Sequence, residues 1–307
     1  MAKRPPDAQP SAKSATMHAF VQWIRAAAPY VHAFRGKTFV IAFGGEGVAD
    51  ESFLGVVHDL NLLHSLGIRL VVIHGMRPQI ETILAQQNIE SRYQRGLRVT
   101  DMETMDCVLE AAGQVRSRIE ALLSLGIQNS PMAGARNRVS SGNYITAKPM
   151  GVVDGIDMQF TGETRRVDAQ AIQQRLDDGD IVLISPLGYS PTGEIFNLAL
   201  EESAMQVAVR LQAHKLIFLM ETDGVRNSRR QLLTDLSTKD AEVLLAKPEK
   251  LSPDVRTFLP CAVRACDNGV KRAHLLSRHM DGALPLELFT RDGVGTMISA
   301  TPLAHLR

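Results

Sequence analysis

Short apolar runs without polar alternation limit most strongly how this chain can fold. They occur at residues 38–43, 69–74, 181–186, 215–221 and 273–277. A strand that reads as a continuous apolar run is buried on both faces of its sheet. Helical patterns lie between most of these runs, at residues 52–65, 78–87, 101–123 and 201–212. This alternation predicts an α/β fold, with an open, mainly parallel sheet covered by helices on both faces.

The first 34 residues stand outside this pattern. Residues 1–16 are polar, rich in proline and alanine, and lack the apolar segment of a secretory signal, so we expect a flexible tail. Residues 17–34 place Phe20, Trp23 and Ile24 at helical spacing, which predicts an amphipathic helix ahead of the main domain. Its apolar stripe needs a surface to cover it. Residues 35–300 contain no linker or repeat and indicate one domain, with a hairpin or an excursion from the sheet expected at residues 153–166.

Charge and cysteine content exclude several classes of function. Lysine plus arginine total 34 against 33 for aspartate plus glutamate, and a net charge of +1 gives no basis for binding nucleic acid or an anionic membrane. No apolar stretch approaches the ~18 residues that span a bilayer. The three cysteines and nine histidines have no metal-binding spacing, and we expect His274 at the surface or the edge of the core. The chain is therefore predicted to be cytoplasmic and to bind no metal.

Two glycine loops follow predicted strands, where ligands bind in open α/β sheets. Gly44 and Gly45 follow the first strand, and Gly75 follows the second, with Arg77 two residues later. Bare backbone at these positions can approach an anion closely. The spacing matches neither the dinucleotide-binding nor the P-loop motif. A tight turn between strand and helix explains these glycines equally well.

A third glycine cluster lies near the C-terminus. Gly293 and Gly295 expose backbone N–H donors, and Thr296 adds a hydroxyl group. Glu287, a few residues earlier, can accept hydrogen bonds from a cation. Together these groups suit a zwitterionic ligand that carries an additional positive charge.

Several segments, in order, resemble one known family. They are FVIAFGGE, LHSLGIRLVVIHGMRPQI, GLRVTD, FNLALEE and ELFTRDGVGTMIS. They closely resemble the amino-acid-kinase-like domain of bacterial N-acetylglutamate synthases, the amino-acid N-acetyltransferases that begin arginine biosynthesis. The resemblance extends from about residue 23 to residue 299. It implies the amino-acid-kinase, or carbamate-kinase-like, fold, which the more weakly matching N-acetylglutamate kinases share.

Charge separates the synthase from the kinase. Kinases of this fold resemble one another in using lysines and glycine loops to neutralise the transferred phosphate. One such lysine would stand two residues before Gly44, where this chain has Ala42, and a second would align with Phe258. The run of three glycines after the second strand is also interrupted here. We therefore predict no kinase activity.

The resemblance implies that L-arginine binds as an allosteric effector. Glu287 would pair with its cationic end, backbone around the C-terminal glycines would hold its carboxylate, and a tyrosine in the leading helix would close the pocket. The alternatives are that Lys215 is an exposed strand start and that Tyr30 is a core residue. The residues implied in arginine binding are Tyr30, Lys215, Glu287, Gly293, Gly295 and Thr296.

A vestigial substrate site is implied at a second place. Arg98 and Asn197 match positions that hold N-acetylglutamate in the kinases, beside Gly44, Gly45 and Gly75. Arg98 could clamp a carboxylate there, or it could equally serve as a buried partner in a structural ion pair.

In the synthases, acetyl transfer belongs to a C-terminal acetyltransferase domain, which we do not find in this sequence. Residues 301–307 would be a remnant of the linker to it, and acetyl-CoA would belong to that domain, so we expect no catalytic residues and no cofactor here. The function expected is an arginine-binding regulatory domain that forms a homo-oligomer, expected to be a hexamer, through the leading helix. Two alternatives are a functioning kinase and a ring-forming subunit that partners a separate acetyltransferase chain.

Overall fold

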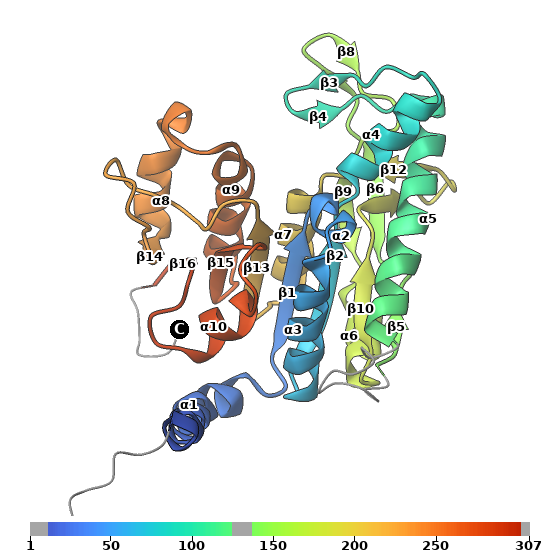
Figure 1. Ribbon diagram of the computed structural model, residues 1–307. Coiled ribbons are helices and arrows are strands. Elements are labelled where there is room, and N and C mark those ends of the chain that lie inside the picture. Colours follow the sequence, from blue (N-terminus) through green and yellow to red (C-terminus); the bar gives the residue numbers. More distant parts are fainter. Residues whose placement is uncertain (1–11, 125–136, 302–307) are drawn as a thin grey trace, which may run out of the picture.

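A computed structural model of the chain describes residues 12–124 and 137–301. Its centre is an eight-stranded sheet (Figure 1). In spatial order the strands are β14 (Asp235–Ser237), β16 (Thr296–Ser299), β15 (Arg272–Ser277), β13 (Lys215–Met220), β1 (Thr38–Phe43), β2 (Arg69–His74), β10 (Ile181–Ile184) and β5 (Val139–Ser140). Neighbouring strands run parallel except β15 and β16, which run antiparallel. The mainly parallel sheet predicted from the apolar runs is confirmed.

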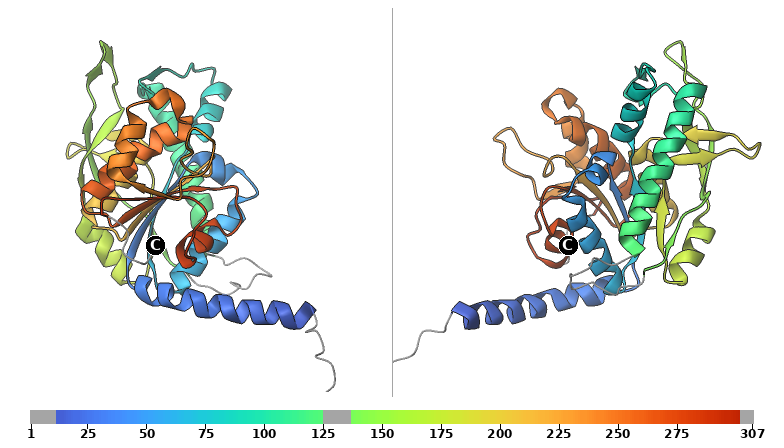
Figure 2. Two further views of the ribbon diagram at one scale, coloured as in Figure 1. Left: turned by 90° about the vertical axis from the view of Figure 1, so that its left-hand side faces the viewer. Right: turned by 45° about the vertical axis from the view of Figure 1, so that its right-hand side comes forward.

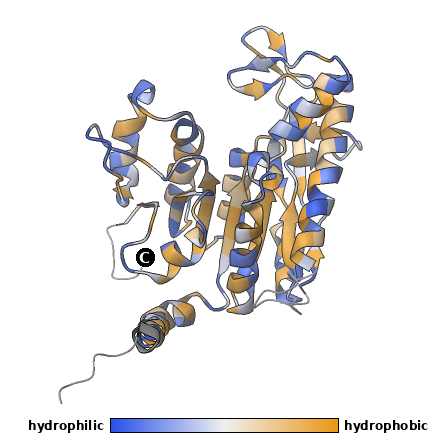
Figure 3. Cartoon of the chain, in the orientation of Figure 1, coloured by the Kyte–Doolittle hydropathy of each residue, from blue (hydrophilic) through white to orange (hydrophobic). Residues whose placement is uncertain are grey.

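Helices cover both faces of this sheet (Figure 1). Successive side chains of β1 point to opposite faces, so that Val40 and Ala42 enter one core cluster whereas Ile41 and Phe43 enter the other. All four are at most 1% exposed, as a strand buried on both faces requires. Figure 3 shows these central strands as apolar along their length. The helices are α1 (Ala12–Phe34), α2 (Gly45–Ala49), α3 (Phe53–Ser65), α4 (Arg77–Gln86), α5 (Met102–Ser124), α6 (Ala169–Asp177), α7 (Leu200–Arg210), α8 (Thr238–Leu245), α9 (Pro253–Asp267) and α10 (Ala283–Phe289), with a 3₁₀ turn at Pro248–Lys250.

Smaller sheets stand above one end of the central sheet (Figure 1). One has four strands in the order β12 (Ile195–Asn197), β11 (Leu187–Tyr189), β6 (Ile145–Pro149) and β9 (Gly162–Val167). Two hairpins pair β3 (Tyr93–Gln94) with β4 (Leu97–Arg98) and β7 (Val152–Val153) with β8 (Ile156–Asp157). The hairpin expected at residues 153–166 is confirmed, since β7 and β8 form it and β9 follows.

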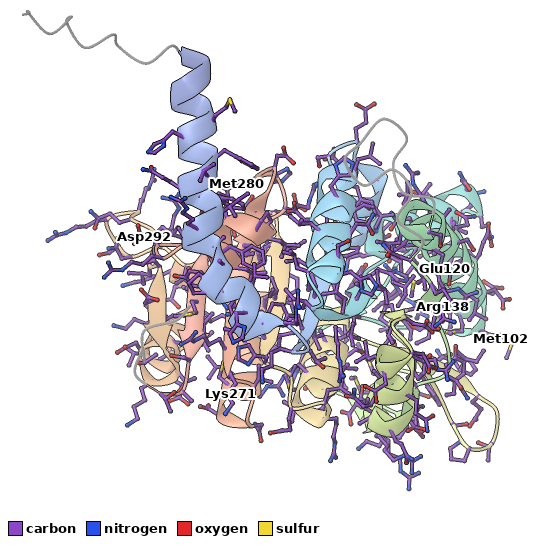
Figure 4. The ribbon with its side chains drawn as sticks, turned by 90° about the horizontal axis from the view of Figure 1, so that it is seen from below. Met102, Glu120, Arg138, Lys271, Met280 and Asp292 are labelled. Carbon is purple, nitrogen blue, oxygen red and sulfur yellow. The ribbon has the colours of Figure 1, made fainter. Side chains whose placement is uncertain are left out.

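The leading helix is longer than predicted. It begins at Ala12 rather than at residue 17, so the expected tail of residues 1–16 overlaps its first turn, and residues 1–11 lie outside the described part of the chain. Its N-terminal half stands away from the domain (Figure 2), and Figure 4 shows this half projecting past the other elements. Pro29 lies inside this continuous helix, just after Ala27, where the described side chains of α1 first enter the core.

Six elements near the C-terminus were not predicted, namely β14, α8, the 3₁₀ turn at Pro248–Lys250, α9, α10 and β16. The segment of residues 287–296, expected to be one loop, begins in α10 and ends in β16. Both elements are too short to show a helical or strand period in the sequence. In the described residues, no helix is both long and apolar enough to cross a membrane.

Candidate functional site

A cleft opens at the carboxyl ends of β1, β2 and β13. The five residues implied in a vestigial substrate site all line it, although they come from distant parts of the sequence. Its walls also carry acidic side chains from α2, α7 and α9, and from the residue that follows β13. The five predicted residues are Gly44, Gly45, Gly75, Arg98 and Asn197.

The glycines of the cleft are required by close backbone packing. A Cβ atom at Gly75 would lie 2.9 Å from the Gly45 nitrogen and 3.0 Å from the Gly44 Cα. A Cβ atom at Gly45 would lie 2.8 Å from the Met76 Cα. The loops after β1 and β2 therefore touch through their backbones, and side chains would separate them. Tight packing of the two loops explains these glycines without a ligand.

Arg98 is held by the protein itself. Its side chain is 5% exposed and pairs with Glu81 at 2.7 Å. It also donates to the Tyr93 hydroxyl at 2.7 Å and to the Ser91 hydroxyl. The guanidinium carbon lies 4.9 Å from the centre of the Tyr93 ring. These contacts support the alternative that Arg98 is a buried partner in a structural ion pair that fastens the β3–β4 hairpin to α4.

Asn197 is also bound within the protein. Its amide nitrogen donates to the Thr100 hydroxyl at 3.1 Å, and Thr161 donates to the same hydroxyl at 2.9 Å. The structure thus brings the predicted substrate residues together, but uses the two polar ones to join the hairpins to the domain. Substrate binding by these residues remains a prediction.

The charge of the cleft is unsuited to a polyphosphate. Four carboxylates line it, from Glu46, Glu201, Glu221 and Asp254, against two guanidinium groups. Glu201 is largely buried, and this burial raises its pKa despite the nearby Arg77. Because the transferred phosphate and the nucleotide are anionic, an acidic wall disfavours both.

The positions where kinases of this fold carry lysines are apolar here. Ala42 is fully buried inside β1 and belongs to the core. Phe258 lines the cleft, and its ring centre lies 4.9 Å from that of Phe218. The aromatic pair leaves no ammonium group to neutralise phosphate at that wall. The absence of kinase activity remains a prediction.

A second candidate site is a buried chain of ionisable groups. Lys215 Nζ lies 2.9 Å from His274 Nε2, and His274 Nδ1 lies 2.7 Å from Glu287 Oε1. All three residues are 0% exposed. They come from β13, β15 and α10, so parallel strands and the following helix bring them together. The alternative that Lys215 is an exposed strand start is wrong, since the lysine is fully buried.

The imidazole of His274 links the other two side chains of this cluster. A lysine ammonium only donates, so next to the ammonium form of Lys215 the Nε2 atom of His274 accepts, and Nδ1 donates to Glu287. Buried charges are retained in this way when hydrogen bonds satisfy them.

Glu287 is ionised despite its burial. Burial alone would raise its pKa, but the contact with His274 and backbone N–H groups lower it to about 2. The Val294 and Gly295 N–H groups donate to Oε2 at 2.7 and 3.0 Å. The third glycine cluster thus wraps around Glu287, because the chain returns from α10 to begin β16.

The other residues predicted to bind arginine have identifiable contacts. The Gly293 N–H donates to the Thr290 hydroxyl at 3.3 Å, and the Thr296 hydroxyl accepts from the Val225 N–H at 2.8 Å. Tyr30 is half-buried and packs against Phe34, with ring centres 6.2 Å apart. The structure therefore gathers Lys215, Glu287 and Gly295, whereas the hydroxyl of Thr296 serves a neighbouring loop.

His274 is the member of the cluster that sequence reasoning missed. It was expected at the surface or the edge of the core, and this prediction is wrong, since the imidazole is fully buried between Lys215 and Glu287. One signal was present. A histidine inside an otherwise apolar strand must find partners within the core, because an unsatisfied buried imidazole is costly.

The leading helix ends on this cluster. Lys215 Nζ lies 5.1 Å from the centre of the Phe34 ring, a cation–π contact. Phe34 also meets Phe39 and Phe289, with ring centres 5.4 and 6.1 Å away. The last residue of α1 therefore touches both β13 and the C-terminal end of α10.

Comparison with known proteins places this geometry in a family. The model of the amino acid kinase family matches residues 37–277. The chain is 48% identical over 292 residues to an amino-acid acetyltransferase of Ectopseudomonas mendocina, covering 95% of this chain and 67% of the relative. It is 50% identical over 284 residues to an amino-acid acetyltransferase of Pseudomonas syringae pv. tomato, covering 92% of this chain and 65% of the relative. The chain belongs to the amino-acid acetyltransferase family, through its amino acid kinase domain. It spans about two thirds of the length of these relatives.

Solved structures agree with this assignment. N-acetylglutamate synthase from Neisseria gonorrhoeae, complexed with coenzyme A and L-arginine, superposes with a TM-score of 0.85 at 39% identity, covering 92% of this chain and 66% of that one. Carbamate kinase from Giardia superposes with a TM-score of 0.63 at 15% identity, which concerns the fold alone. Two expectations from the sequence motifs are therefore confirmed. They are the resemblance to the amino-acid acetyltransferase family and the carbamate-kinase-like fold.

Proposed function

We propose that this chain is the arginine-binding regulatory and oligomerisation domain of an N-acetylglutamate synthase, and that it is not catalytic by itself. The observation that carries the proposal is the buried Lys215–His274–Glu287 cluster, whose ionised carboxylate is of the kind that pairs with a guanidinium group. A solved relative that is 39% identical was complexed with L-arginine. The acidic cleft, without the kinase lysines, supports a regulatory role rather than phosphoryl transfer.

Arginine binding would be coupled to movement of the leading helix. Glu287 is 0% exposed, so a ligand reaches its carboxylate only if the surrounding elements move. The contacts of Phe34 with Lys215 and Phe289 make the end of α1 one of these elements. A ligand that binds one arrangement of α1 better than another shifts the population toward it.

The projecting half of α1 supports self-association. Its apolar side chains Phe20, Trp23 and Ile24 are 61%, 42% and 47% exposed in the single chain. Exposed apolar stripes of this kind mark interfaces. We propose that these stripes pack between copies of the chain in a homo-oligomer, with a hexamer as the expected state. Light scattering should give a mass well above the 33.6 kDa of one chain, and a monomer at micromolar concentration would contradict this part of the proposal.

Calorimetric titration with L-arginine tests the effector site. The unmodified chain should bind arginine, and Glu287→Gln should abolish binding because the variant removes the negative charge. Glu201→Gln is a matched control, since it neutralises a buried carboxylate in the other site and should leave arginine binding unchanged. Absence of binding to the unmodified chain, or equal binding by Glu287→Gln, would reject the site.

The alternative function as an N-acetylglutamate kinase is tested on the same preparation. Incubation with ATP, magnesium and N-acetylglutamate should yield no ADP above background, because Ala42 and Phe258 replace the cations that phosphoryl transfer requires. Turnover that depends on N-acetylglutamate would instead establish the kinase.

A further inference from the structure

The start of helix α10, which carries Glu287, packs on α3. Two residues one turn apart on α3, Gly55 and Asp59, lie at this contact. Asp59 is 9% exposed, and its Oδ2 accepts a hydrogen bond from the Leu284 N–H at 3.3 Å. A Cβ atom at Gly55 would lie 2.8 Å from Oδ1 of Asp281, so the glycine leaves room for the side chain of Asp281 in the turn that precedes α10.

Asp59 supplies a cap that α10 lacks in its own sequence. The first N–H groups of a helix have no partner within it and are usually satisfied by a side chain at the N-cap. Here the N-cap is Gly282, in the left-handed conformation at φ 71°, and it makes no side-chain cap. A carboxyl oxygen from another helix takes that place and accepts the hydrogen bond from the Leu284 N–H.

Helix α10 has seven residues, and contacts fix both of its ends. Its first turn rests on α3 through Leu284, and Phe289 at its last turn meets Phe34 of α1. Glu287 lies between these two contacts, three residues after the amide that Asp59 caps. Its carboxylate must stay within hydrogen-bond distance of His274 and of two backbone N–H groups. A shift of about 1 Å in the helix would break such contacts.

We propose that Asp59 is a positioning residue for the arginine site, which fixes the start of α10 and thereby the place of Glu287. The inference rests on the proposed function, because it assigns Asp59 a role in that site. Asp59 would not touch arginine. It would act through the hydrogen bond to Leu284, so any side chain that accepts this bond in the same place should preserve arginine binding.

Three variants of the full chain test this role by calorimetric titration with L-arginine. Asp59→Ala removes the acceptor and should weaken binding by about tenfold or more, because the buried Leu284 N–H loses its partner. Asp59→Asn keeps an acceptor oxygen and should stay within about threefold of the unmodified chain. Gly55→Val is a neighbouring control: it crowds only the side chain of Asp281 and leaves the hydrogen bond from Leu284 to Asp59 in place, so arginine binding should not change.

A control separates positioning from general loss of stability. Ile172→Ala removes a fully buried side chain of α6, in the other core cluster, and should lower stability without changing arginine affinity well below its melting temperature. Hydrogen exchange should show faster exchange at the Leu284 and Val294 amides in Asp59→Ala only. Folded Asp59→Ala that binds arginine like the unmodified chain would overturn this inference alone. So would a loss of about tenfold or more in Asp59→Asn or in Gly55→Val, whether or not Asp59→Ala folds. Failure of the unmodified chain to bind arginine would overturn the proposed function with it.

Discussion

Replacing Asp59 with asparagine should make the fold more stable at alkaline pH. Burial raises the pKa of Asp59 from 3.8 to about 7, and repulsion from Asp281 adds to this rise, although the hydrogen bond from Leu284 opposes it. In the folded state the neutral carboxyl is therefore preferred up to about pH 7, whereas in the unfolded chain the proton leaves near pH 4.

The sign and size of the effect follow from linkage. Because the pKa is higher in the folded state, the stability that the neutral carboxyl of Asp59 contributes is fully present below the pKa of the unfolded chain. This stability is lost as the pH rises through the pKa of the folded state. The rise of Asp59 from 3.8 to about 7 corresponds to about 4 kcal/mol in total, and about 3 kcal/mol of this falls between pH 5 and pH 8. Asp59→Asn has no proton to lose and should be spared this decline.

Urea unfolding of both proteins at several pH values between 5 and 8 measures the difference. The stability of Asp59→Asn relative to the unmodified chain should increase by about 3 kcal/mol across this range. Asp50→Asn is a control, because hydrogen bonds from Ser52 and Arg278 lower the pKa of Asp50 to about 2, so this carboxylate stays ionised throughout. If the unmodified chain and Asp59→Asn lose stability in parallel, the carboxyl of Asp59 does not titrate as argued.

Three further predictions concern the C-terminal part of the fold and α1. Gly295→Ala should destabilise the protein by about 3 kcal/mol in urea unfolding, since its Cβ would lie 2.3 Å from the Leu275 carbonyl oxygen. Gly113→Ala, where a Cβ meets nothing within 4 Å on α5, should instead stabilise by about 1 kcal/mol, and equal effects would refute the packing argument. The pKa of Glu287 is lowered to about 2, so its carboxylate stabilises the fold above its ordinary pKa of 4.5, and this contribution is lost as the pH falls. Acid unfolding followed by circular dichroism should therefore depend less on pH in Glu287→Gln than in the unmodified chain. Phe34→Ala should cost about 4 kcal/mol in thermal unfolding because it empties a fully buried aromatic site, and a loss under 1 kcal/mol would show that α1 does not anchor there.

The parts of the fold that could be predicted are those with a repeated pattern. The strands at residues 38–43 and 69–74 were found because every side chain in them is buried or nearly so, and this leaves a continuous apolar run. Helix α10 could not be found in this way. It has seven residues, and its start depends on Asp59, a residue more than 200 positions away that no local pattern connects to it.

The candidate sites, like the fold, could be predicted only in part from the sequence. Gly44, Gly45 and Gly75 were correctly placed at one cleft, because the carboxyl ends of parallel strands meet at one edge. Sequence could not tell whether these glycines serve a ligand or the contact between two loops, since both need bare backbone. His274 was missed because a single histidine gives no spacing, and its importance arises only when β15 places it beside Lys215.

Pro29 removes one backbone hydrogen bond from the leading helix. Proline has no amide hydrogen, so the backbone bond to the carbonyl of Arg25 is absent and the helix is weakest at that turn. On one side lies the segment that rests on the domain through Phe34, and on the other lies the segment with exposed Trp23 and Ile24. The backbone of α1 therefore resists bending least at a turn close to Ala27, which is still packed in the core.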